Sequence, residues 1–283
     1  VHSAEVDQIR VEDGKVLGVR LASGEEIDCG TVISNAGIQN TVQRLLPSEA
    51  QAAKRLNQDL ANLEDTYAVV GLNIGFKASG HVMDFTPANI WAHPSRAFET
   101  NLAEHKADFS AAFPWVFITF PSMKDPSWDN HYPDKATVEM YAYTDYSHFE
   151  KWAGTRWMKR GDDYLAVKAE IETRLLEELF RYAPKARDHV DYVEVSTPLS
   201  YETFVKRERG GFMGVASTPE RFRQKWLRAT LPLEGLYLTG QDVTSDGIIG
   251  ALMGGVLAAS AVVEKDLLSE IKSDELEKRK MKV

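Results

Sequence analysis

The residues best suited to chemistry lie in a stretch from residue 235 to residue 263. A short apolar run ends at Gly240, a polar loop follows, and a segment rich in Gly and Ala begins at Gly247. This pattern predicts a buried parallel strand, a tight turn and a helix with an exposed N-terminus. Free N–H groups there can hold an anion or the polar chain of a nucleotide. An ordinary buried strand–loop–helix unit would give the same pattern.

The helix predicted from Gly247 onward has two further features. Asp246 directly precedes it, where a side-chain oxygen can accept hydrogen bonds from the first free N–H groups. Small residues within it are spaced so that a neighbour can pack closely on one face: Gly250, Ala251, Gly254, Gly255, Ala258 and Ala259.

Two runs of residues carry a resemblance to a known family. LYLTGQD followed by GIIGAL resembles the C-terminal flavin-binding segment of the retinol saturase, carotenoid isomerase and phytoene desaturase family. TVISNAGIQNTVQRLLP, at residues 31–47, is similar to the segment where that family's chain leaves its FAD domain. The runs occur in the family's order and at roughly its spacing, so the resemblance covers most of the chain. It is closest to the retinol saturase branch.

Those proteins are FAD-dependent oxidoreductases with an amine-oxidase-like fold. The resemblance implies an α/β protein (α+β overall), in which a mixed-sheet substrate domain is inserted into an incomplete FAD-binding Rossmann-like domain. The family opens with G-x-G-x-x-G, which this sequence lacks. We therefore expect the C-terminal part of a longer protein, without its N-terminal dinucleotide-binding segment. The expected parts are the FAD domain at 1–40 and 200–267, the substrate domain at 41–199 and a charged tail at 268–283.

The resemblance also implies the ligands. FAD is the implied cofactor, and NAD(P) is a candidate electron partner. We expect little or no FAD on this chain alone, and no activity, because the pyrophosphate would rest on the missing fingerprint. Asp242 should accept a hydrogen bond from the ribityl chain, and Val6 should meet the adenine through its backbone. The implied cofactor contacts are Val6, Asn35, Ala36, Gly240, Gln241, Asp242, Gly247, Ile248 and Ile249.

Composition excludes several classes of protein. The 283 residues are 43% hydrophobic and 27% charged, as in a globular protein of one or two domains. The net charge of −9 argues against a nucleic-acid partner. The single cysteine, Cys29, excludes an intramolecular disulfide framework and favours a reducing compartment, with a structural thiol. The longest uncharged stretch, 247–263, falls short of the roughly 20 apolar residues that span a bilayer. We expect a cytoplasmic protein, and the family's lipid substrates leave peripheral membrane contact open.

The N-terminal part predicts strands and then helices. Residues 5–28 alternate, with turns at Asp13-Gly14 and Ser23-Gly24, which predicts a hairpin or meander. Residues 31–33 predict a short buried strand. From residue 39 to about 63 the pattern is helical, interrupted by Pro47, and Ser48 can cap the second helix.

A possible substrate wall lies in the strand predicted at residues 67–77. Gly71, Asn73 and Gly75 share one face of it, and glycines on a strand face often mark close approach by a ligand or a backbone. We therefore predict these three residues to bind substrate; plain tight packing is the alternative. Residues 79–160 are the most aromatic, with antiparallel strands predicted at 115–120 and 137–143. Such residues form core or hold a long apolar molecule.

The clearest helix is predicted at residues 162–183, before a strand at 189–196. Its apolar face should comprise Leu165, Ala169, Leu175, Leu176 and Leu179. The charged residues from 264 to 283 predict a solvated helix that frays at its end.

No acid–base or metal-binding constellation stands out. The chain has no H-E-x-x-H, G-x-S-x-G or P-loop motif, so we predict no metal site and assign no catalytic residue. The resemblance implies an oxidoreductase that adds, removes or isomerises C=C bonds in an isoprenoid, retinoid or carotenoid-type lipid, with flavin performing the hydride step. The substrate would be a lipophilic small molecule. Alternatives are an amine-oxidase-like flavoenzyme and a non-enzymatic lipid-binding protein of the GDP-dissociation-inhibitor fold, which flavin content would distinguish.

Overall fold

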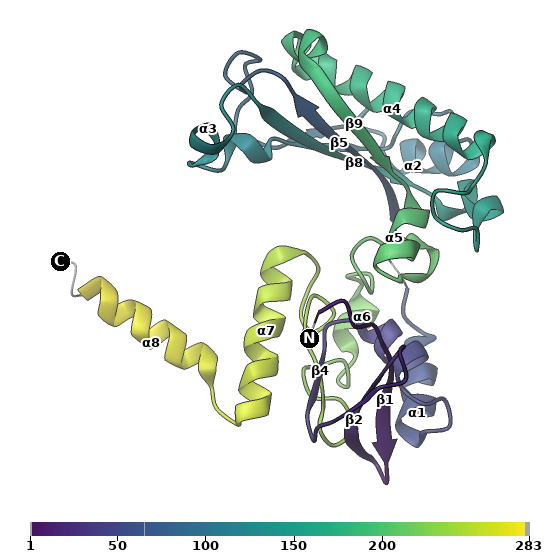
Figure 1. The fold of residues 1–283 in the computed structure, drawn as a ribbon, viewed down its shortest axis with the longest axis vertical. Helices are drawn as coiled ribbons and strands as arrows, with labels where there is room; N and C mark the ends of the chain where they lie inside the picture. Colours follow the sequence, from purple (N-terminus) through teal and green to yellow (C-terminus); the bar gives the residue numbers. More distant parts are fainter. Residues whose placement is uncertain (1, 65, 281–283) are drawn as a thin grey trace. The chain divides into compact units, whose positions relative to one another are not determined.

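The chain forms two compact units in a computed structural model that describes residues 2–64 and 66–280 (Figure 1). One unit comprises Val1–Thr66 and Met213–Val283, and the other comprises Tyr67–Phe212. Each unit has its own apolar core. The ends of the inserted unit are joined, because the Phe212 N–H donates to the Tyr67 carbonyl. Within the first unit, the Thr66 N–H likewise donates to the Gly214 carbonyl.

The first unit opens with the predicted meander. It contains the antiparallel strands β1 (Val6–Glu12), β2 (Lys15–Leu21) and β3 (Glu26–Asp28). Asp13 and Gly14 have φ values of 47° and 79°, and a two-residue hairpin turn with positive φ at both positions matches the twist of its strands.

The other strands of this unit form a parallel pair. β4 (Val32–Ser34) lies beside β10 (Leu236–Leu238), with Val32 opposite Leu236 and Ser34 opposite Leu238. Both predicted strands are confirmed. Because the strands are parallel, their carboxyl ends meet at the same edge, where ligands bind in open α/β sheets.

The helices after β4 belong to the first unit, so the boundary between the units differs from the one expected. The π-helical segment η1 (Asn40–Leu45) and helix α1 (Gln51–Leu60) bury Val42, Leu56 and Leu60 in the core of the first unit. The structure therefore divides the chain after residues 66 and 212, and not after 40 and 199. Ser48 does not cap α1, since the N-cap is Ala50 and the Ser48 hydroxyl donates to Glu49.

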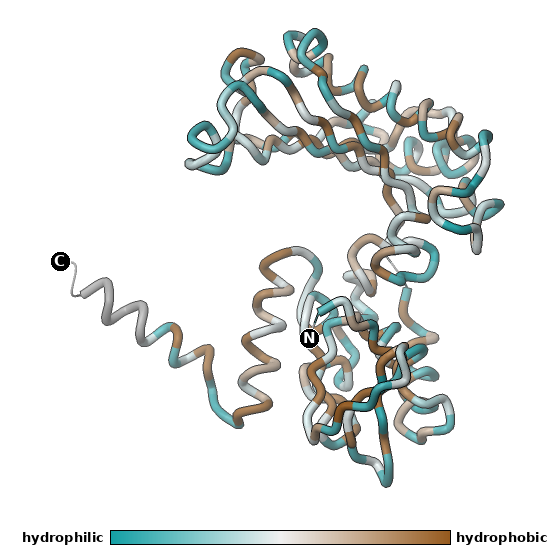
Figure 2. Tube along the Cα trace, in the orientation of Figure 1, coloured by the Kyte–Doolittle hydropathy of each residue, from teal (hydrophilic) through white to brown (hydrophobic). Residues whose placement is uncertain are grey.

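Three helices follow in the C-terminal part of this unit: α6 (Pro219–Arg223), α7 (Gly247–Val263) and α8 (Leu267–Lys280). Figure 2 shows the apolar character of α7. In the described part of the chain, no single helix is long and apolar enough to cross a membrane; α7 and Leu267–Ser273 pass that test only as a pair bent by 114°. The predicted tail helix is confirmed up to residue 280, and residues 281–283 lie outside the described residues.

The second unit is built on one five-stranded antiparallel sheet. Its strand order is β6 (Ile90–Ala92), β7 (Val116–Thr119), β8 (Ala136–Thr144), β5 (Ala68–Phe76) and β9 (Val190–Ser196). Our expectation of a mixed sheet is therefore wrong, because all neighbouring strands in this sheet are antiparallel. Helix α4 (Asp162–Tyr182) returns the chain so that β8 and β9 run in the same direction, but β5 lies between them and runs antiparallel to both.

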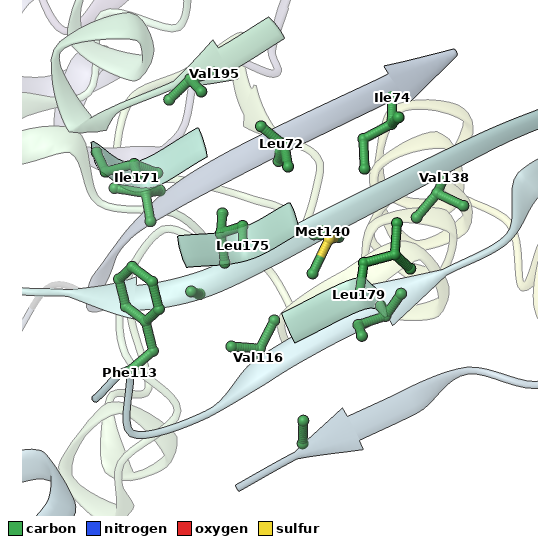
Figure 3. Packing of buried hydrophobic residues seen from close by; sticks show 14 of the residues in the cluster. Leu72, Ile74, Phe113, Val116, Val138, Met140, Ile171, Leu175, Leu179 and Val195 are labelled. Carbon is green, nitrogen blue, oxygen red and sulfur yellow. The ribbon is translucent and has the colours of Figure 1, made fainter. Parts of the chain in front are cut away.

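Side chains from one face of this sheet pack against α4 (Figure 3). Leu72 and Met140 from the sheet lie beside Leu175 and Leu179 of the helix, which confirms these two predicted positions. The predicted Leu176 is also confirmed, since it is partly buried against the same core. Leu165 is 60% exposed and Ala169 is also exposed, so these two predictions are wrong. The shorter helical segments are α2 (Phe98–Ala107), η2 (Pro121–Met123), α3 (Trp128–His131), η3 (Tyr146–His148), η4 (Glu150–Trp152), η5 (Pro184–His189), α5 (Pro198–Phe204) and η6 (Glu208–Gly210).

One histidine is buried at the edge of this core. His105 on α2 places Nδ1 3.2 Å from the Ala111 carbonyl oxygen, among the rings of Phe109, Phe113 and Tyr143. Its Nε2 has no hydrogen-bond partner among the residues that the structure describes. Burial therefore lowers the pKa of His105 to about 4.

This histidine predicts an acid-sensitive fold. Its pKa in the folded state lies below its ordinary value of 6.5, so its stabilising effect is complete above about pH 6.5 and is lost as the pH falls toward about 4. Acidification from about pH 7 to about pH 5 should lower the free energy of unfolding by about 2 kcal/mol through this group. Urea unfolding at both pH values checks this, with His105→Phe expected to show a smaller loss. An equal loss in parent and variant would contradict the assignment.

Candidate functional site

The candidate site of the first unit lies where β4 and β10 end. Asn35 and Ala36 follow β4 and are exposed, whereas Gly240 and Gln241 follow β10 and are half-buried. Gly240 has a φ of 90°, and a Cβ there would collide with Asn35 Oδ1. The structure thus brings together the residues that were predicted on these two runs. We call Asn35, Ala36, Gly240 and Gln241 the strand-end group.

Helix α7 holds the strand-end group from the other side. A Cβ at Gly254 would collide with the Gly240 carbonyl oxygen, and one at Gly250 would collide with the Ser245 carbonyl oxygen. The small-residue face that the sequence predicted therefore packs against the chain's own loop. Gly240 is fixed between Asn35 and α7.

The N-terminus of α7 is open. Gly247 has a φ of 87°, and no heavy atom lies within 4 Å of the position its Cβ would take. Ile248 and Ile249 are 80% and 76% exposed. The predicted Asp246 cap is wrong, because this side chain makes no cap hydrogen bond and instead accepts from the Ser217 hydroxyl. Asp246 therefore leaves the first N–H groups of α7 free for another acceptor.

Asp242 has a structural role in the first unit. It is 1% exposed, and its two carboxylate oxygens accept from the backbone N–H groups of Ile38, at 2.8 Å, and Val215, at 3.1 Å. The carboxylate therefore holds two chain segments together, and its expected hydrogen bond to the ribityl chain stays a prediction. Asp242 joins the turn after β4 to the segment after Met213 and to its own loop.

Arg221 on α6 is a part of this site that sequence reasoning missed. It is buried, and its guanidinium donates to the Val215 and Gln241 carbonyl oxygens, each at 2.6 Å. Burial lowers the pKa of Arg221, while the charges of Asp242 and Asp246 oppose that shift. The only sequence signal is the Thr218-Pro219 helix start, which places Arg221 on a short helix but gives no sign of these contacts.

Val6 lies in a different sheet from β4 and β10, whose ends carry the strand-end group. It is the half-buried first residue of β1 and pairs with Leu21 in the three-stranded sheet. Its expected contact with adenine stays a prediction. Cys29 is a free, half-buried thiol.

The second unit has an aromatic face on the side of its sheet opposite α4. The strand register places one row across all five strands: Trp91, Phe117, Tyr141, Gly71 and Ser196. The ring centroids of Trp91 and Phe117 lie 4.8 Å apart, and those of Phe117 and Tyr141 lie 6.5 Å apart. Trp91 is 59% exposed. We call this row of five residues, with the sheet surface on which it lies, the aromatic face.

The three predicted substrate residues fall into two groups. Gly71 is buried, and a Cβ there would lie 2.5 Å from Ser196 Oγ and 3.4 Å from the Tyr141 ring, so a side chain would require Ser196 to move. At Gly75 a Cβ would meet only Tyr192 Cβ, at an ordinary 3.5 Å. Asn73 is exposed on the same face. Asn73 and Gly75 are therefore accessible to a ligand, whereas Gly71 lies against Ser196 and Tyr141. Substrate binding by the three residues stays a prediction.

Tyr141 can donate a hydrogen bond on this face. Burial, with a contribution from Glu139, raises the pKa of Tyr141 to about 12. Its hydroxyl donates to Glu139 Oε2 at 3.3 Å. The phenol is therefore neutral near pH 7 and does not act as a base there.

These two surfaces suit different chemistry. The strand-end group and the open end of α7 offer amide and backbone N–H groups, which hold polar or anionic groups without changing their protonation. The aromatic face offers flat apolar contact. Within residues 2–64 and 66–280, no group of three or more His, Cys, Asp or Glu side chains could hold a metal ion.

Comparison with known proteins confirms the resemblance. The chain is 29% identical over 270 residues to all-trans-retinol 13,14-reductase of Homo sapiens, covering 92% of this chain and 44% of that protein. It is 27% identical over 270 residues to prolycopene isomerase 1, chloroplastic, of an Oncidium hybrid cultivar, covering 93% and 42%. It is also 26% identical over 276 residues to a Danio rerio protein named inactive all-trans-retinol 13,14-reductase, covering 94% and 45%. The chain thus spans less than half the length of these relatives. No family model matches it.

Solved structures share the fold. An oxidoreductase from Methanosarcina mazei matches with a TM-score of 0.54 and 19% identity, over 93% of this chain and 49% of that one. A putrescine oxidase variant matches with a TM-score of 0.51 and 13% identity, over 92% and 48%. These likenesses support the α/β class that the sequence predicted.

Asp242 should be much more important for stability than Asp246. Asp242→Ala leaves the buried N–H groups of Ile38 and Val215 without their acceptor, which should cost about 3–5 kcal/mol of unfolding free energy. Asp246→Ala removes a single side-chain hydrogen bond and should cost about 1 kcal/mol. Urea unfolding, with hydrogen exchange of the Ile38 and Val215 amides, measures both effects. Unchanged protection of those amides in Asp242→Ala would show that the carboxylate does not hold them.

Proposed function

We propose that this chain forms part of a flavin-dependent enzyme that adds or removes hydrogen across C=C bonds of an isoprenoid-type lipid, or isomerises those bonds. The observation that carries the proposal is the 29% identity to all-trans-retinol 13,14-reductase across 92% of the chain. The strand-end group and the aromatic face support it, because they suit a dinucleotide and a flat apolar chain respectively.

The residues of the first unit fit a flavin nucleotide. Asn35, Gln241 and the first N–H groups of α7 would hold its polar chain, and the positive end of the helix dipole favours its anionic groups. Gly240 and Gly247 keep side chains out of that space, and exposed Ile248 and Ile249 offer apolar contact. A dinucleotide-binding segment with a glycine fingerprint, which this sequence lacks, would complete the site. FAD supplies the hydride chemistry when bound.

The aromatic face would position the lipid. Aromatic rings pack on a flat conjugated chain, and Trp91, Phe117 and Tyr141 form such a surface. In the next row of the register, Asn73 lies between Glu139 and Glu194, which can accept a hydrogen bond from a hydroxyl end. The chain's own part in the reaction is therefore to bind and orient, with the Tyr141 ring as an apolar contact, because its hydroxyl already donates to Glu139.

Lipid binding without turnover is the second candidate function. The 26% identity to a relative named as inactive favours it, because similarity of this kind includes proteins without the reaction. Turnover of a polyene by the flavin-loaded protein separates the two candidates.

FAD titration tests the flavin site. This chain should bind FAD weakly, since the expected anchor of the pyrophosphate is absent from its sequence. Asn35→Ala should weaken binding about fivefold further through the loss of one hydrogen bond. Flavin fluorescence measures the affinity, and Asn62→Ala, an exposed asparagine away from the strand ends, is the matched control. Tight stoichiometric flavin would refute the external anchor, and equal affinity for parent and Asn35→Ala would remove Asn35 from the site.

Leucine substitutions test the aromatic face. Gly75→Leu should keep the fold and weaken binding of a retinoid about tenfold or more by covering the face. Gly71→Leu should instead lower the unfolding temperature, because its side chain meets Ser196 and Tyr141. Quenching of tryptophan fluorescence by the retinoid reports binding, with Gly30→Leu in the first unit as the control. Parent-like retinoid affinity in Gly75→Leu would exclude this part of the sheet as a lipid site.

A further inference from the structure

The second unit carries a concentrated patch of exposed apolar side chains outside the aromatic face. Met158 is 80% exposed, Phe204 64% and Leu165 60%, and they are accompanied by exposed Trp157 and Val205. We call these five residues the apolar patch. Single exposed hydrophobic residues are normal, whereas a contiguous group of them marks an interaction surface.

Contacts among its elements show that the patch is continuous. The rings of Trp157 and Phe204 lie 5.2 Å apart. A surface hollow of about 440 Å³ is lined by Trp157, Met158 and Leu165, so it links the loop before α4 to the first turn of that helix. Arg160 fastens this loop to α5, since its guanidinium donates to the Leu199 carbonyl at 3.2 Å and to the Thr203 hydroxyl at 3.0 Å.

The backbone at both edges of the patch is strained. Met158 and Lys206 have φ values of 60° and 59°, a left-handed conformation that non-glycine residues rarely adopt. Such conformations persist only where the surrounding structure holds them, and they cluster at functional sites. Here the left-handed residues lie in the two loops that expose Trp157, Met158, Phe204 and Val205.

Cations surround the patch. The loop sequence from residue 156 to 160 reads RWMKR, and Lys168 lines the hollow beside Leu165. Arg156, Lys159 and Lys168 form no ion pair within the described chain. One carboxylate, Asp162, also lines the hollow. Of the neighbouring carboxylates, Asp163 pairs with Lys151, and Glu202 lies on α5. The four cations Arg156, Lys159, Arg160 and Lys168 outnumber Asp162 and Glu202, so the local charge is positive although the whole chain has a net charge of −9.

We propose that the apolar patch inserts into the surface of an anionic lipid membrane. Trp, Met, Leu and Phe side chains surrounded by Lys and Arg form the pattern that binds the boundary between headgroups and acyl chains. Electrostatic attraction decays over about 8 Å at physiological salt, so the cations beside the patch dominate over distant acidic residues. The inference rests on this surface alone and does not depend on the proposed flavin chemistry.

Vesicle cosedimentation of the full chain tests the proposal. The chain should bind vesicles of phosphatidylcholine mixed with phosphatidylserine more strongly than vesicles of pure phosphatidylcholine, and added salt should weaken the binding. Trp157→Ala should lower the partition coefficient about tenfold. Replacing Arg156 and Lys159 by Glu should lower it about fivefold or more for each charge.

Matched controls distinguish binding through the apolar patch from nonspecific binding to vesicles. Val82→Glu alters an exposed apolar residue and Arg96→Glu an exposed cation, both in the same unit and outside the patch, and both should bind as the parent does. Circular dichroism melts confirm that each variant is folded. Three results would overturn the proposal: no binding to the phosphatidylserine vesicles, parent-like binding by the patch variants, or light scattering that shows a dimer disrupted by Leu165→Glu while vesicle binding is unchanged. The last result would assign the surface to a second copy of the chain.

Discussion

A single buried carboxylate determines how the first unit is assembled. Asp242 lies in the loop after β10, and its two oxygens accept from segments about 200 residues and about 30 residues away along the chain. Hydrogen bonds to a charged group contribute about 1.5–3 kcal/mol each, and the loss of one partner leaves a buried polar group unsatisfied. Arg221 adds a buried positive charge that holds two carbonyls of the same region. This polar centre lies beside the strand ends and the start of α7, because Arg221 holds the Gln241 carbonyl and Asp242 holds the Ile38 N–H.

Regular structure followed from sequence wherever one simple physical rule decided it. Period-two alternation identified β5, alternation with turn residues identified the meander, and small residues identified the packed face of α7. The partner of that α7 face could not be predicted, because its contact with the Gly240 carbonyl depends on a loop whose path is set by tertiary contacts.

Polar side chains were the least predictable part. Asp242 and Asp246 lie four residues apart in one loop. The expected role of Asp242 came from the resemblance, and that of Asp246 came from the local rule for helix caps. In the structure Asp242 bonds to distant backbone, and Asp246 bonds to Ser217 in place of the first N–H groups of α7. Leu165 shows the same limit for apolar residues: its spacing fits the core face of α4, but the helix turns that position toward solvent beside Trp157.

The joined ends of the inserted unit have a consequence for modularity. Because Tyr67 and Phe212 are hydrogen-bonded to each other, and Thr66 and Gly214 are as well, the chain leaves the first unit and returns to it at nearly the same place. Excision of residues 67–212 would leave two ends that a few flexible residues could rejoin, and the excised segment would keep its own core. Such an arrangement lets evolution or protein engineering exchange the inserted unit while the polar centre around Asp242 stays intact.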